Sequence, residues 1–281
     1  MAQKINVGGI NVKSKYEIEY EAKVRAKVRR QMFMSDEEKI KDNAKENSDL
    51  LSFSISRDSS NFSDNLDEHI NKSIRGYDLL TDDIVNLSTH FVVDDSNVYD
   101  LGCSKGTTIN RIRENNIKSR NVYYYGIDFN PSFDSGQNYI NMFFKQEDIR
   151  CWKNIGVDNQ YRTNSSFILS MFTMQFIEED EKLKVLDDIF NKSLRVGGAL
   201  ILCEKIVTPD TKFQNMMDFI YKKYMSQFFY EDDILKKEKE LRHLAKLQTE
   251  EDIINNLKKI GFRNIEIFWK NLNFIGLVAI K

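Results

Sequence analysis

Acidic side chains at the ends of apolar segments are the residues of this sequence best suited to bind a ligand. Residues 97–106 read NVYDLGCSKG: a short apolar stretch contains Asp100 and then breaks into a loop of small residues. The loop holds Gly102, Cys103, Ser104 and Gly106. Residues 107–112 then have helical spacing. In a doubly wound α/β sheet, such a loop holds a nucleoside-containing ligand, although a junction that needs small residues only for close packing would look the same.

A second acid, Asp128, follows the apolar segment 122–127 and lies about 20 residues beyond the loop, where a carboxylate accepts hydrogen bonds from both ribose hydroxyls. A nicotinamide dehydrogenase would carry the same acid. It would also need the pattern G-x-G-x-x-G so that its backbone can approach a pyrophosphate, but Ser104 occupies the middle glycine position here. The negative charge of Asp100 would repel a pyrophosphate, whereas it suits the ammonium group of a methionine moiety. We therefore predict that the ligand is S-adenosylmethionine (SAM), a sulfonium cofactor.

Two more segments are predicted to reach the same edge of the sheet. Asp148 and Ile149 follow a third strand, where the acid would accept the adenine amino group while the isoleucine packs on the ring; the alternative is a surface turn. Residues 170–176, SMFTMQF, end a fourth strand, and ligands of open α/β sheets bind beyond the carboxyl ends of the strands. We expect Met171 and Gln175 to line the pocket there.

Composition argues against metal and membrane chemistry. The 281 residues carry a net charge of −2, which gives no global argument for binding nucleic acid or a membrane. The cysteines and histidines are scattered without C-x-x-C spacing, so we expect no metal site. No apolar run approaches the roughly 18 residues of a membrane-spanning helix, and no signal-peptide pattern opens the chain, so we expect a cytoplasmic protein.

The chain divides into two parts. Residues 1–60 form a charged extension with a predicted helix at residues 16–34, and this helix holds the basic cluster Arg25, Lys27, Arg29 and Arg30. The cluster is either a solvated helix face or a contact for the phosphates of a nucleic acid. Residues 61–281 form the predicted SAM-binding domain.

Strand and helix signals alternate in this domain in the βαβ manner. We predict helices at residues 64–73, 77–89, 107–115, 132–144, 179–194, 210–225, 230–244 and 249–260. We predict strands at residues 97–100, 122–127, 166–171, 199–204, 264–269 and 274–280, with a further strand ending near residue 148. The last two strands make an antiparallel hairpin on a parallel sheet, which is typical of the class I methyltransferase fold, a Rossmann-like doubly wound α/β sheet.

The chain resembles the carboxy-S-adenosylmethionine synthase family, enzymes with the methyltransferase fold that supply a carboxylated cofactor for modification of the tRNA wobble uridine. The resemblance covers about residues 62–281. Five motifs carry it: SIRGY at 73–77, YDLGCSKG at 99–106, FTMQF at 172–176, GGALILCEK at 197–205 and NFIGLVAIK at 273–281.

The resemblance implies which residues bind the cofactor. They are Tyr77, Gly102, Cys103, Ser104, Asp128, Phe129, Asp148 and Ile149. It also exposes departures from the family pattern, because Met171 stands at the pocket asparagine and Glu238 at the arginine that binds the added carboxylate. Lys237 and Lys239 flank Glu238, and a shift of one residue would let either take the role of the arginine.

Our first functional hypothesis is a SAM-dependent methyltransferase whose acceptor is a small molecule or a nucleic acid. The candidate catalytic or acceptor-binding residues are Tyr77, Gln175, Glu204, Lys205, Tyr224, Lys237 and Lys239. The alternative is the family reaction, in which a carboxylate carrier such as prephenate donates its carboxyl carbon to SAM. A third possibility is a SAM-binding interaction subunit without catalysis. The resemblance further implies a homodimer.

Overall fold

A computed structural model describes residues 6–7, 10–11, 66–129, 141–150 and 163–281 of the chain. The strands β1 (Asn6–Val7) and β2 (Ile10–Asn11) pair as a small antiparallel hairpin. The predicted helix at residues 16–34, with the basic cluster Arg25, Lys27, Arg29 and Arg30, lies outside the described residues, so the phosphate contact stays a prediction.

One seven-stranded sheet with the strand order β5-β4-β3-β6-β7-β9-β8 forms the centre of the domain. Its strands are β3 (Asn97–Leu101), β4 (Tyr123–Asp128), β5 (Met142–Gln146), β6 (Ser165–Met171), β7 (Leu194–Lys205), β8 (Asn264–Asn271) and β9 (Phe274–Ile280). Neighbours from β5 to β7 are parallel, whereas β9 runs antiparallel to both β7 and β8. The chain passes from β3 to β4 on one side and later returns to β6 on the other, so a switch point opens at the carboxyl ends of β3 and β6. The predicted doubly wound sheet with its closing hairpin is confirmed.

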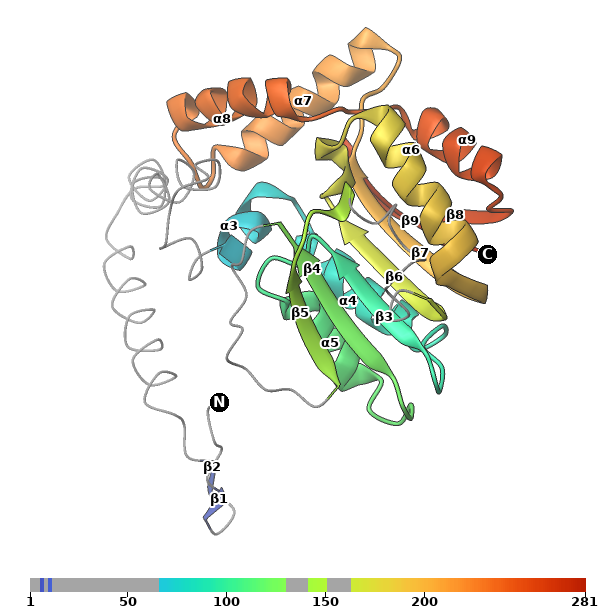
Figure 1. Ribbon diagram of the computed structural model, residues 1–281. Helices are drawn as coiled ribbons and strands as arrows, with labels where there is room; N and C mark the ends of the chain where they lie inside the picture. The colour runs from blue at the N-terminus through green and yellow to red at the C-terminus, as the bar shows by residue number, and fades with distance from the viewer. Residues whose placement is uncertain (1–5, 8–9, 12–65, 130–140, 151–162) are drawn as a thin grey trace.

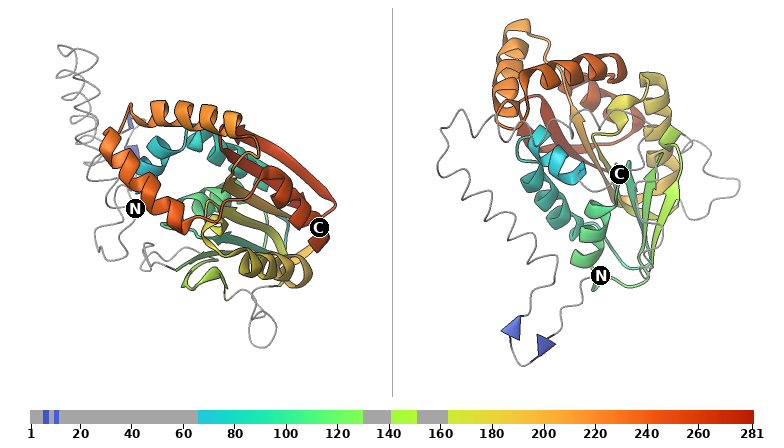
Figure 2. Two further views of the ribbon diagram at one scale, coloured as in Figure 1. Left: turned by 90° about the horizontal axis from the view of Figure 1, so that it is seen from above. Right: turned by 90° about the vertical axis from the view of Figure 1, so that its left-hand side faces the viewer.

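Helices cover both faces of the sheet and its carboxyl edge (Figure 1). α4 (Tyr77–Ser88) and α5 (Thr107–Asn115) lie on one face, and α6 (Glu179–Asp188) and α9 (Glu250–Ile260) on the other. α3 (Leu66–Ser73) lies beside the pair formed by α7 (Thr211–Met225) and α8 (Glu231–Leu244) above the strand ends (Figure 2). Within the described ranges, none of the helices combines the length and the apolarity that crossing a lipid bilayer requires.

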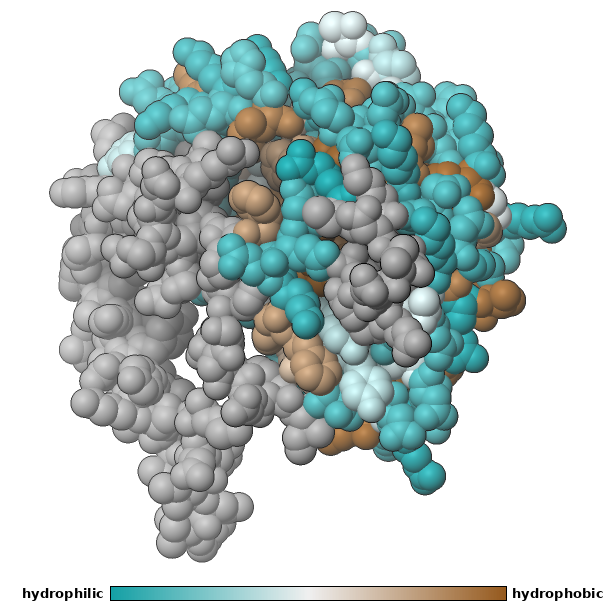
Figure 3. All heavy atoms as spheres, viewed as in Figure 1, coloured by the Kyte–Doolittle hydropathy of each residue, from teal (hydrophilic) through white to brown (hydrophobic). Residues whose placement is uncertain are grey.

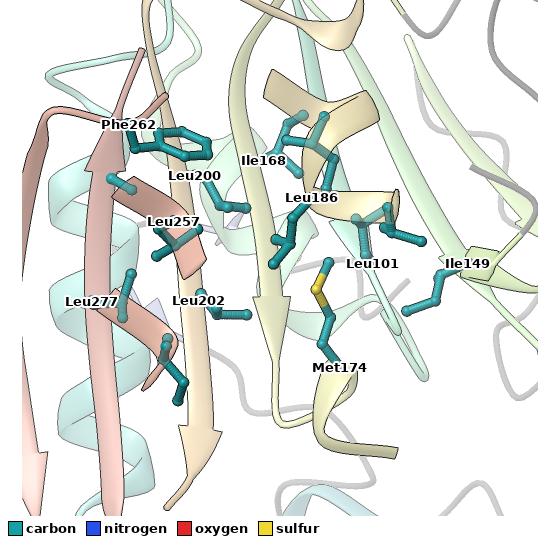
Figure 4. Close-up of a cluster of buried hydrophobic side chains, with 14 of the residues drawn as sticks. Leu101, Ile149, Ile168, Met174, Leu186, Leu200, Leu202, Leu257, Phe262 and Leu277 are labelled. Carbon is teal, nitrogen blue, oxygen red and sulfur yellow. The ribbon is translucent and has the colours of Figure 1, made fainter. Parts of the chain in front are cut away.

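Alternation along the central strands divides the core into two layers. In β6, Phe167 and Leu169 belong to the layer under α4 and α5, whereas Ile168 belongs to the layer under α6 and α9. Figure 4 shows this second layer, in which Ile168 and Leu202 of the sheet lie with Leu186 of α6. The visible surface of the described residues is mostly hydrophilic, with apolar side chains in small groups (Figure 3). Burial on both faces holds the strand ends, and therefore the loops that follow them, in fixed positions.

Two predicted elements are corrected by the structure. The helix predicted at residues 132–144 is wrong at its end, because Met142–Gln146 is the strand β5, which pairs in parallel with β4 and extends the sheet. The helix predicted at 179–194 ends as an α-helix at Asp188, since a π turn (η4, Ile189–Ser193) follows and β7 already begins at Leu194. At residues 142–146, pairing with β4 outweighs local helical spacing. In the second segment, the chain stays helical as a π turn until Leu194 pairs with Ser165 of β6.

Candidate functional site

A cavity of about 300 Å³ opens at the switch point, between the strand ends and the helices α3, α4, α7 and α8. Ligand pockets typically have volumes of this order or larger. The predicted residues that line it are Tyr77, Asp100, Gly102, Cys103, Ser104, Met171, Gln175, Lys205 and Lys237. The structure therefore brings together most of the residues that the sequence assigned to one site.

The loop between β3 and α5 is held rigidly against the end of β4. Gly102 and Cys103 donate backbone hydrogen bonds to the Ile127 carbonyl at 2.7 and 3.1 Å, and Ser104 N donates to Asp128 Oδ2 at 2.7 Å. Gly102 has a φ of +85°, and a Cβ placed on it would lie only 2.0 Å from the Thr173 Oγ1. The position thus requires glycine for both its backbone conformation and its contact with the β6 end.

The remaining predicted cofactor residues surround the loop without lining the cavity. Asp128 accepts from the Ser104 amide through Oδ2, and Arg150 donates to both oxygens of the Asp148 carboxylate. Ile149 is packed in the core, whereas Phe129 is exposed. Gly106 is likewise outside the cavity wall, with Phe144 where a side chain would project. The ribose and adenine contacts predicted for these residues stay predictions.

Asp100 is the acidic group of the cavity, and it is almost fully buried. Burial, together with the nearby Asp128 carboxylate, raises the pKa of Asp100 to about 8. Among the described residues, no group donates a hydrogen bond to its side chain. The buried Ser104 Oγ beside it also has no hydrogen-bond partner in this part of the chain. Both groups can therefore contact a ligand. A cationic ligand would lower the pKa of Asp100 and so favour its negatively charged form.

Two lysines supply positive charge to the same cavity. Lys205 ends β7, and its Nζ lies 5.2 Å from the ring centre of Tyr221 and 5.8 Å from that of Phe274. Lys237 of α8 places its Nζ 2.5 Å from His69 Nε2. Burial lowers the pKa of Lys205, and burial with the charge of Lys205 lowers the pKa of Lys237 to about 8. Within the described segments, neither amino group has a carboxylate at ion-pair distance, so both charges are available to an anion.

The register of α8 resolves the departure at Glu238. Ile234, Lys237 and Leu241 share the inward face of the helix, and Lys237 and Leu241 line the cavity. Glu238 lies outside the cavity wall and forms ion pairs with Lys222 at 2.8 Å and Arg242 at 2.9 Å. The basic residue next to Glu238 is thus the one that reaches the cavity, and the carboxylate is neutralised elsewhere.

Three other candidate acceptor-binding residues lie away from the cavity. Glu204 is buried on the α6 side of β7, 2.8 Å from the buried Lys182, and burial raises its pKa. Tyr224 donates from its hydroxyl to the Asn71 carbonyl at 3.2 Å, and Lys239 is exposed. Since none of these side chains lines the cavity, their predicted contact with an acceptor is not supported by this geometry.

Sequence reasoning missed several residues of the cavity wall. His69, Thr173, Tyr221 and Phe274 all line it, and they come from α3, the β6 end, α7 and β9. Signals were present for two of them: the spacing of His69 with Ser73 and Tyr77 puts an inward face on α3 and the start of α4, and Thr173 lies in the segment 170–176 that was predicted to end the fourth strand. Among the described residues, no three His, Cys, Asp or Glu side chains gather as a metal site.

The strand order and site position define a class I methyltransferase fold. No family model matches the chain. The pyocyanin biosynthetic protein PhzM superimposes with a TM-score of 0.50 at 12% identity, covering 77% of this chain and 58% of that one. A possible exported protein from Bordetella parapertussis has the same TM-score at 15% identity, with coverages of 72% and 67%. These likenesses concern the fold.

Among curated proteins, the chain is similar to carboxy-S-adenosyl-L-methionine synthases. It is 29% identical over 219 residues to that of Staphylococcus epidermidis, covering 76% of this chain and 91% of the relative. It is 29% identical over 221 residues to that of Mannheimia succiniciproducens, with coverages of 75% and 88%. The predicted resemblance to this family is confirmed.

Proposed function

We propose that this protein is a SAM-dependent transferase that binds the cofactor along the β3–α5 loop. The observation that carries this assignment is the buried Asp100 carboxyl group, which has no hydrogen-bond donor in the described part of the chain and precedes the fixed loop of Gly102 to Ser104. Asp100 would hold the ammonium group of the methionine moiety, and Asp128 would accept from the ribose. Bound SAM would supply an electrophilic sulfonium carbon at the cavity. The names of the curated relatives and the fold support the same cofactor.

We propose further that the second ligand is an anion, and that carboxy-SAM formation with prephenate is the reaction this cavity supports best. Lys205 and Lys237 leave two positive charges near the cofactor loop without a carboxylate partner among the described residues. These lysines would orient the carboxylate groups of the donor. The rings of Tyr221 and Phe274 cover the Lys205 amino group and exclude water beside it, which would strengthen its attraction to a carboxylate of the donor. Because of these two lysines, we place carboxy-SAM formation before methyl transfer, which reverses the order drawn from the sequence.

Methyl transfer to an acceptor remains the second candidate. Met171 lines the cavity with a thioether where the family has an amide that donates hydrogen bonds, so one polar contact of the family reaction is missing. An acceptor that carries phosphates, such as a nucleic acid, would also suit the two lysines. The homodimer and the tRNA pathway stay predictions drawn from the resemblance.

The deciding experiment is incubation of the purified protein with SAM and prephenate, followed by mass spectrometry of the nucleosides. Carboxylated SAM is the expected product, and Lys237→Met should reduce its formation while the exposed neighbour Lys239→Met should not. Failure of SAM to bind would contradict the cofactor assignment. Binding of SAM without any carboxylated product would favour the methyltransferase, and unbiased analysis of co-purified ligands would then identify the acceptor.

A further inference from the structure

His69 occupies an unusual place for a histidine, because it is buried beside an amino group. It lies on α3 with only 3% of its surface exposed, and the ring of Phe229 meets it edge-on with centroids 5.4 Å apart. Its Nε2 lies 2.5 Å from Lys237 Nζ and 3.2 Å from Ser73 Oγ. Its Nδ1 is buried and has no hydrogen-bond partner among the described residues.

The surroundings determine the protonation of this ring. Burial and the charges of Lys237 and Lys72 lower the pKa of His69 to about 3, so the imidazole is neutral at physiological pH. An ammonium group can only donate, so Nε2 must accept and the ring proton lies on Nδ1. His69 therefore holds the Lys237 amino group by a hydrogen bond to a neutral acceptor.

A neutral acceptor has a different electrical effect from a carboxylate. A carboxylate at this distance would fix the lysine but would also cancel its charge. The charges that act on Lys237 are Lys205 of β7, which lowers its pKa, and Glu240 of its own helix, which raises it. On α3, Lys72 faces His69. The positive charge of Lys237 is thus held in place and left available.

We propose that His69 is a positioning residue for Lys237: its neutral imidazole fixes the ammonium group at the cavity wall without neutralising it, so that the group can bind a carboxylate of the second ligand. This inference rests on the proposed function, since the anion is the second ligand of that reaction. It assigns a role to a side chain that the family motifs do not contain.

The hydrogen bond can be tested without any ligand. The rate of Lys237 acetylation by acetic anhydride, followed by mass spectrometry across pH, reports the fraction of its amine that is neutral. His69→Leu removes an acceptor from the ammonium group and should move the labelling midpoint to lower pH, whereas His69→Glu should move it to higher pH. His90→Leu, at an exposed histidine, should leave it unchanged. Unchanged midpoints in both His69 variants would overturn the inference.

The availability of the Lys237 charge is tested by titrating prephenate into the full-length protein with S-adenosylhomocysteine present. His69→Leu should weaken prephenate binding about tenfold, as expected for one hydrogen bond to a charged group, and His69→Gln should recover most of it. His69→Glu should weaken binding as much as Lys237→Met does, although it still offers an acceptor. A purely structural role for His69 would instead leave the glutamate variant with native affinity.

The two proposals fail in different ways. S-adenosylhomocysteine affinity within twofold of native identifies variants that are correctly folded. If the native protein binds S-adenosylhomocysteine but no prephenate, the anionic second ligand is wrong and this inference falls with it. If the native protein binds prephenate and the leucine and glutamate variants bind it equally well, only the role of His69 is overturned.

Discussion

At the scale of single residues, this site is built from ionisable groups whose charged forms have no counter-charge among the described residues. Asp100 is buried without a donor among the described residues, and Lys205 and Lys237 are half-buried at the cavity wall without a carboxylate at ion-pair distance in the same part of the chain. Unpaired buried charges destabilise a fold, so they persist where a ligand compensates for them. The ligand is expected to bring the opposite charges, namely a cation for Asp100 and an anion for the lysines.

The raised pKa of Asp100 predicts a pH dependence of cofactor binding. With a pKa of about 8, the carboxyl group of the free protein is mostly protonated at pH 6 to 7 and must lose its proton to hold an ammonium group. SAM affinity should therefore rise by up to about tenfold between pH 6 and pH 7. Calorimetry in buffers of different ionisation enthalpy should detect the released proton. In Asp100→Asn, affinity should be weak and flat over this range; a native protein with flat affinity would contradict the assignment.

At the scale of elements, loops and helices determine which side chains reach the cavity. The β3–α5 loop is predictable because a strand-end acid followed by small residues is typical of a nucleoside-binding turn in this kind of sheet. The inward face of α8 can also be read from the sequence, since Ile234, Lys237 and Leu241 share one face of the helix. By contrast, Tyr221 and Phe274 reach the cavity only through the packing of α7 and β9 over the strand ends, and no local spacing reports such packing.

Local patterns also mislead where two structures compete for one segment. Residues 142–146 show apolar and polar spacing compatible with a helix, yet they form β5 because β4 offers an unpaired edge. The same limit applies to Glu204, whose position at a strand end suggested a ligand contact. Its side chain lies on the α6 side of the sheet and pairs with Lys182. Only the three-dimensional partner distinguishes these cases.

The loop geometry predicts a contrast between two glycines. Gly102 and Gly197 both have positive φ, at +85° and +78°, but a Cβ would collide with Thr173 only at Gly102 and would meet nothing within 4 Å at Gly197. Gly197→Ala should reduce the free energy of unfolding by about 1 kcal/mol through backbone strain alone. Gly102→Ala should cost at least about 1 kcal/mol more and weaken SAM binding, as measured by urea unfolding and calorimetry. Equal losses would show that the Thr173 contact is unimportant.

The buried pair between α6 and β7 makes a second prediction at this scale. Lys182 and Glu204 are both almost fully buried, with Nζ 2.8 Å from Oε2. Lys182→Met leaves the carboxylate uncompensated and should lower the free energy of unfolding by about 3 kcal/mol or more. Lys182→Met combined with Glu204→Leu should recover much of that loss. A double variant as unstable as the single one would mean that packing, and not charge, dominates there.

At the scale of the whole molecule, the site lies where both core layers and the α7–α8 pair meet, so ligand binding should stabilise the entire domain. SAM at 100 times its dissociation constant should add about 2.7 kcal/mol to the free energy of unfolding. The thermal midpoint should rise accordingly in differential scanning calorimetry, and Asp100→Asn should abolish most of the rise. A native protein whose thermal midpoint does not change on addition of SAM would contradict the cofactor assignment.

The strand order has a consequence for how the domain folds during its synthesis. β9 lies between β7 and β8 in the sheet but follows β8 in the chain, and β9 is the partner of β8 among the described strands. A nascent chain that ends at β8 therefore has no place to dock it. Phe274, opposite Lys205 in the β7–β9 register, also supplies part of the cavity wall. During synthesis on the ribosome, the parallel part of the sheet can form first, but the binding cavity closes only after residues 274–280 have emerged.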